Sequence, residues 1–72
     1  MELMIEGVSR GEFSKQFIKV SQTAEDTVDI TVVNRTVEVF RPDCVNEQTV
    51  ILTKENLDLL ITALGYANER MT

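Results

Sequence analysis

The sequence predicts one small α+β domain, residues 1–72, in which an antiparallel sheet of three to five strands packs against a single C-terminal α-helix. Three observations indicate this class. Residues 27–41 are rich in β-branched side chains that alternate with a period of two, as strands with one buried face do. Residues 48–52 read as a short strand that runs directly into a segment with helical spacing of its leucines. A chain of 72 residues can build one hydrophobic core and no second one.

The first 26 residues hold two candidate strands. Residues 2–8 form a short mixed segment that we expect at an edge of the sheet. Residues 12–22 fit two interpretations, because Phe13, Phe17 and Val20 have helical spacing whereas the end of the segment alternates as a strand would. We prefer the strand and keep the helix as the alternative.

Residues 27–41 are predicted to form a hairpin with a two-residue turn at Asn34 and Arg35, because Asn tolerates positive φ at the first turn position. In this register Val32 lies opposite Val37. The pairing collects five aliphatic side chains on one face: Val28, Ile30, Val32, Val37 and Val39.

After the hairpin, Arg41 and Pro42 are expected to end the ladder, because proline cannot donate a backbone hydrogen bond. Residues 43–47 are then interpreted as a connecting loop, and residues 48–52 as the strand that precedes the helix.

The C-terminal helix is predicted to begin after Thr53, a suitable N-cap, with Glu55 in its first turn. Its end is expected between Leu64 and Glu69. One apolar stripe follows the spacing i, i+3, i+4 and i+7: Leu57, Leu60, Ile61 and Leu64. We expect this stripe to lie on the sheet as the lid of the core.

The charge of the chain favours some partners over others. The net charge is −5. The first 20 residues are balanced, so the later residues carry the whole acidic excess. Nucleic-acid binders normally carry a basic stripe or face, so the acidic balance disfavours that class, although a local basic patch can outweigh the total. A chain this small also gains stability by burying a face against a second subunit, so we expect a homodimer.

Residues that could carry chemistry are few. The sequence has no histidine and one cysteine, Cys44, so it offers no zinc ligand set and no internal disulfide. Glu25, Asp26 and Asp29 form the densest acidic group, which we interpret as a solvated turn in preference to a cation site. No phosphate-binding loop or nucleophile motif is present. We predict no catalytic residue, no metal and no cofactor, and therefore no enzyme.

The single cysteine is also typical of a reducing compartment. No apolar run in the sequence approaches the roughly 18 residues of a membrane span, and Glu2 and Glu6 stand where a signal peptide would be basic. We therefore expect a cytoplasmic protein without membrane contact.

Two groups of residues are the candidate partner-binding surfaces. If residues 12–22 form a strand, two aromatic and two basic side chains share one of its faces: Phe13, Lys15, Phe17 and Lys19. Such a strip could stack nucleic-acid bases or hold a protein. Val33 and Phe40 fall on the outer face of the predicted hairpin and are too apolar for full solvation.

The sequence thus predicts a non-enzymatic protein-interaction module, such as a small phage or bacterial accessory regulator or inhibitor. The identity of its protein partner does not follow from the residues. The alternative is a dimer that binds single-stranded nucleic acid through the strip at Phe13, Lys15, Phe17 and Lys19.

Overall fold

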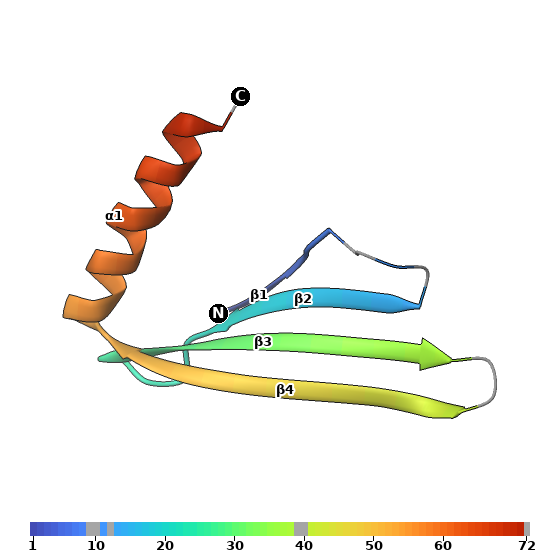
Figure 1. Ribbon diagram of the computed structural model, residues 1–72. Helices are drawn as coiled ribbons and strands as arrows, with labels where there is room; N and C mark the ends of the chain where they lie inside the picture. Colours follow the sequence, from blue (N-terminus) through green and yellow to red (C-terminus); the bar gives the residue numbers. More distant parts are fainter. Residues whose placement is uncertain (9–10, 12, 39–40, 72) are drawn as a thin grey trace.

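The computed structural model describes residues 1–8, 11, 13–38 and 41–71. It confirms the predicted α+β class, with an antiparallel sheet followed by one C-terminal helix (Figure 1). The elements follow in the order β1 (Glu2–Glu6), β2 (Ser14–Ser21), β3 (Thr27–Glu38), β4 (Arg41–Thr53) and α1 (Lys54–Arg70).

The four strands form one sheet in the order β1-β2-β3-β4, so each strand pairs with its neighbour in the sequence. Every pairing is antiparallel. The interpretation of residues 2–8 as an edge strand is confirmed by β1, and the preferred interpretation of residues 12–22 as a strand is confirmed by β2. Such nearest-neighbour topology needs only short connections.

The predicted hairpin turn is wrong. Asn34 and Arg35 lie inside β3, where they pair with Asn46 and Val45 of β4. A type I′ turn needs positive φ at both central residues, and no described non-glycine residue has a positive φ. The long ladder between β3 and β4 satisfies many more backbone groups than a short hairpin would.

The corrected register changes the partners of the aliphatic residues. Val32 pairs with Gln48 in place of Val37, and Ile30 pairs with Val50. Val39, the predicted partner of Ile30, lies outside the described residues. The aliphatic residues Val28 and Ile30 of β3 therefore lie beside Leu52 and Val50 of β4.

The predicted stop at Arg41 and Pro42, and the predicted loop at 43–47, are also wrong, because β4 begins at Arg41 and includes both segments. β4 is an edge strand. Proline is tolerated near the beginning of an edge strand, where its missing N–H need not interrupt a ladder.

The sheet has two faces of different composition. One face, here called the aliphatic face, follows from the register as Leu3, Ile5, Ile18, Val20, Val28, Ile30, Val32, Val50 and Leu52. The other, the mixed face, carries the residues between them. Of the described hydrophobic residues only Val28 is buried, with 6% of its surface exposed. The core therefore sits at one end of the aliphatic face and is small.

The helix follows the sheet without a loop. Thr53 ends β4 and is also the N-cap of α1, as predicted, although its side chain makes no capping hydrogen bond. The helix continues through Gly65 to Arg70, just beyond the predicted range. Figure 1 shows α1 rising steeply from the end of β4, so that its second half stands clear of the sheet.

The packing of α1 is consequently limited to its beginning. Leu57 and Leu60 are half-buried. Ile61 and Leu64, which continue the same stripe, are 56% and 59% exposed. The expectation that the whole stripe covers the core is therefore wrong, and the reason is the direction that the direct junction gives the helix.

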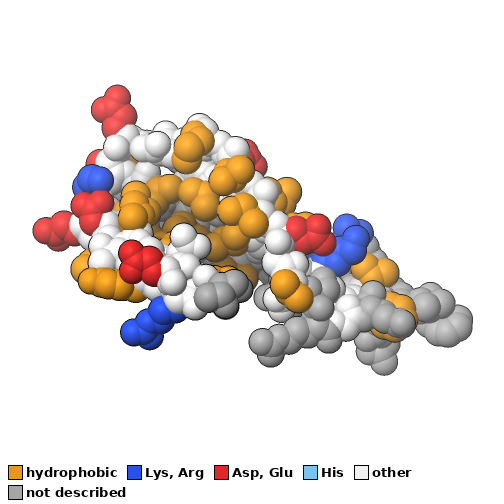
Figure 2. Space-filling view, turned by 90° about the horizontal axis from the view of Figure 1, so that it is seen from above, with side chains coloured by type: hydrophobic (Ala, Val, Ile, Leu, Met, Phe, Trp, Pro, Cys, Tyr) orange, Lys and Arg blue, Asp and Glu red, His pale blue; other side chains and the backbone are white. Residues whose placement is uncertain are grey.

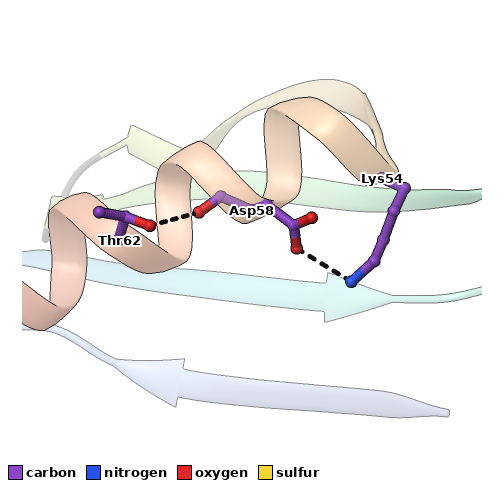
Figure 3. A network of polar contacts seen from close by, with 3 residues as sticks. All are labelled: Lys54, Asp58 and Thr62. Carbon is purple, nitrogen blue, oxygen red and sulfur yellow. Dashed lines mark hydrogen bonds and ion pairs between the residues drawn. The ribbon is translucent and has the colours of Figure 1, made fainter.

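The polar side of α1 is held by local contacts (Figure 3). The Lys54 ammonium lies 2.9 Å from an Asp58 carboxylate oxygen, one helical turn away at the i,i+4 spacing. The Thr62 hydroxyl donates a hydrogen bond of 2.9 Å to the Asp58 carbonyl.

A disulfide can test the register. Thr36 and Cys44 are direct cross-strand partners, and such pairs have Cα separations of about 4.5–5.5 Å, within the range that a disulfide spans. We predict that Thr36→Cys closes an intramolecular disulfide with Cys44 on mild oxidation, seen by mass spectrometry as the loss of the two thiol hydrogens.

Asn34→Cys is the matched control, because Asn34 pairs with Asn46 and lies diagonal to Cys44, about 7–8 Å away. Its thiols should stay free. Equal closure in both variants, or free thiols in Thr36→Cys, would contradict the register.

Candidate functional site

The mixed face brings most of the predicted partner-binding residues together. Lys15, Phe17 and Lys19 alternate along β2 on this face, and Phe13, which precedes the strand, accepts a 2.7 Å hydrogen bond from the Val37 N–H through its carbonyl. Val33 of β3 is the direct cross-strand partner of Phe17. The structure therefore joins two groups that the sequence presented separately. Phe40 lies outside the described residues.

A shallow pocket of about 410 Å³ occupies the middle of the mixed face. Phe17 and Val33 lie side by side within it. Residues of all four strands line it: Met4, Phe17, Lys19, Val33, Arg35, Val45 and Glu47.

Four of these lining residues, Met4, Arg35, Val45 and Glu47, were not among the predicted site residues. Arg35 was placed in a turn, and Val45 and Glu47 in a loop. The signal that could have found them is the alternation Val45, Glu47, Thr49 and Ile51, which has the period of a strand.

The charges of the mixed face are of both signs. The Lys19 ammonium lies 3.1 Å from a Glu2 carboxylate oxygen across β1 and β2. Phe17 has Glu6 as its partner on β1. At the other end of β2, Lys15 lies opposite Arg35. Of the two lysines of the predicted strip, Lys19 is therefore close to a carboxylate and Lys15 lies opposite a second basic residue.

Two threonine hydroxyls form a hydrogen bond between β3 and β4 on this face. The Thr31 and Thr49 hydroxyls are direct cross-strand neighbours and make a hydrogen bond of 2.9 Å. Such threonine pairs stabilise a sheet modestly.

A second surface lies on the opposite side of the sheet, between the aliphatic face and α1. A pocket of about 200 Å³ marks its closed end, where Leu57 of the helix approaches Val28 and Leu52 of the sheet. From there the helix and the sheet diverge. Figure 2 shows apolar side chains gathered in one open patch, with acidic side chains around it. We call this region the apolar hollow.

Groups with potential chemistry are scattered in the part of the chain that the structure describes. No three metal-binding side chains come together there, which includes the acidic residues Glu25, Asp26 and Asp29. Cys44 is an exposed free thiol on β4. No buried polar side-chain atom lacks a hydrogen-bond partner among the described residues.

Comparison with protein-family models, curated proteins and solved structures found no match for this chain. Within the described residues, α1 is too short and too polar to cross a membrane. The functional interpretation therefore depends on the geometry of the two surfaces.

The two phenylalanines of the mixed face should differ in their contribution to stability. Phe17 is half-buried beside Val33, whereas Phe13 is 50% exposed. We expect Phe17→Ala to lower the free energy of unfolding by about 2–3 kcal/mol, below the value for a fully buried Phe. Phe13→Ala should cost about 1 kcal/mol or less.

Urea unfolding followed by circular dichroism, with both variants at one protein concentration, measures the difference. An equal loss for both would show that Phe13 is part of the core and not an accessible contact residue.

Proposed function

We propose that this chain is a non-enzymatic protein-interaction module, a small accessory regulator or inhibitor of the phage or bacterial kind that binds another protein in the cytoplasm. The observation that carries the proposal is the exposure of apolar side chains on both faces of the sheet. An antiparallel sheet with one solvated face normally confines its apolar residues to the other. Here Met4 and Val45 are 60% and 50% exposed on the mixed face.

The pocket on the mixed face has the composition of a protein-binding surface. Its apolar centre is formed by Phe17 and Val33, with Met4 and Val45 beside them. Charged residues of both signs line the same pocket: Lys19, Arg35 and Glu47. An apolar centre with a charged rim is the usual anatomy of an interface between proteins. The mixture of signs suits a protein partner better than a uniform polyanion.

One observation supports the alternative, single-stranded nucleic-acid binding. Lys15 lies directly opposite Arg35, so two basic residues share this end of the mixed face. A basic pair beside Phe13 and Phe17 is suited to a phosphate backbone with stacked bases. The carboxylates of Glu2, near Lys19, and of Glu47, in the pocket, favour the protein partner over this alternative.

A double variant of the mixed face tests both functions. Phe13→Ser with Lys15→Glu changes two exposed side chains and should leave the circular dichroism spectrum unchanged. We predict that immobilised wild-type chain retains a specific protein from the lysate of its source organism and that this variant loses it. The control, Tyr66→Ser with Arg70→Glu, likewise removes an exposed aromatic ring and reverses a basic charge, but on the helix, and should retain the protein.

Retention of the same proteins by both variants would contradict the assignment of the mixed face. Fluorescence anisotropy with a labelled single-stranded oligonucleotide at low salt separates the alternatives. Binding that weakens with salt and disappears in Phe13→Ser with Lys15→Glu would favour nucleic acid. No binding at tens of micromolar protein would exclude it.

A further inference from the structure

The chain exposes far more surface than a compact monomer of its mass. Its accessible surface is 6371 Å², whereas a folded monomer of 8.2 kDa is expected to expose about 4,500 Å². The excess is about 1,900 Å². The radius of gyration, 14.8 Å, likewise exceeds the value of about 11 Å expected for a compact chain of this length.

Several of the exposed apolar side chains line the apolar hollow. On the aliphatic face, Val32 and Val50 are 47% and 57% exposed. Across the hollow, Ile61 and Leu64 of α1 are exposed to a similar extent. A helix stripe and a sheet face are the two surfaces that normally bury each other, yet here each faces water.

The chain cannot close the hollow by itself. β4 ends at Thr53 and α1 begins at Lys54, so no loop is available to fold the helix back. Thr53 also pairs with Thr27 in the ladder. Laying α1 flat on its own sheet would therefore require breaking the end of β4.

The charged residues of the sheet are unevenly distributed between its two faces. Of the strand residues whose side chains are described, every charged one lies on the mixed face: Glu2, Glu6, Lys15, Lys19, Asp29, Arg35 and Glu47. The aliphatic face carries none of them. Depletion of charge is the mark of an interface core, so a partner that covers the aliphatic face would desolvate none of these charged strand side chains.

We propose that the apolar hollow binds a second copy of this chain, with α1 of each protomer lying in the hollow of its partner. A two-fold arrangement covers both the helix stripe and the aliphatic face at once. If each chain buries its excess, the interface totals about 3,800 Å², within the range of obligate homodimers. The two mixed faces remain outside the interface, so each is left open to a protein partner. The dimer deepens the proposed function and rests on it only for this role of the mixed faces.

Sedimentation equilibrium of the full chain gives the first test. The wild type should have about twice the monomer mass of 8.2 kDa at micromolar concentration. Leu64→Lys should abolish the dimer, because it places a charge in an apolar interface. Thr62→Lys, on the polar side of the helix, should leave the dimer intact. A folded wild-type monomer, or a Leu64→Lys dimer of unchanged affinity, would overturn the proposal.

Cross-linking decides the arrangement even if Leu64→Lys fails to fold. In a Cys44→Ser background, a tagged Ile61→Cys chain is refolded together with untagged Val50→Cys or Ile51→Cys chains and treated with a short bis-maleimide. Val50 and Ile51 are neighbours on opposite faces of β4. The tagged–untagged product should form at least about tenfold faster with Val50→Cys, since only that thiol faces the partner helix.

Equal yields, or a preference for Ile51→Cys, would overturn the proposed arrangement. Failure of the dimer and failure of the proposed function are distinguishable. A dimer that retains no protein on its mixed face would contradict the function alone, whereas a monomer that retains a protein lost in Phe13→Ser with Lys15→Glu would contradict the dimer alone.

Discussion

The direct junction between β4 and α1 is the constraint on which the rest of the structure depends. Because Thr53 is both the last residue of the strand and the N-cap of the helix, the strand sets the direction in which the helix leaves. The helix can bring only its first turns, around Leu57, against the sheet. Farther along the helix, Ile61 and Leu64 are mostly exposed, and Val28 is the only buried hydrophobic residue among those described.

The two faces of the sheet also differ in their chemistry. The aliphatic face carries no charged residue among the described strand side chains and lies opposite an exposed helix stripe, so its chemistry is that of an interior surface. The mixed face combines exposed apolar side chains with charges of both signs around one pocket, which is the chemistry of a surface that binds and releases a partner. We infer that the aliphatic face forms the dimer interface and that the mixed face binds the protein partner.

Local sequence patterns were sufficient for the elements but not for their pairing. The β-branched alternation of residues 27–33 and the helical spacing after Thr53 are properties of neighbouring residues, and both predicted elements exist. The register of β3 with β4 is a choice between competing ladders. Asn34 and Arg35 offered a plausible turn, but the longer ladder satisfies more backbone groups. The predicted stop at Pro42 failed for a related reason. The hydrogen bond that a proline removes from a sheet depends on whether its strand lies at an edge.

The candidate site could likewise be predicted within one strand but not across strands. Alternation along β2 placed Lys15, Phe17 and Lys19 on one face, whereas the contributions of Val45 and Glu47 required the correct register. The position of the helix could not be predicted from the spacing of its apolar residues. An apolar stripe indicates that one side of a helix is covered, but it does not identify the covering surface. The same stripe fits an intramolecular lid and an intermolecular contact.

The central claim, that this chain folds with its apolar hollow covered by a second copy, is tested most directly by the concentration dependence of its stability. Urea unfolding curves at two protein concentrations a hundredfold apart compare the midpoints under otherwise identical conditions. If folding and association are coupled, dilution lowers the stability of the dimer by about 2.7 kcal/mol, and the midpoint falls. A midpoint that does not move with protein concentration would contradict the claim.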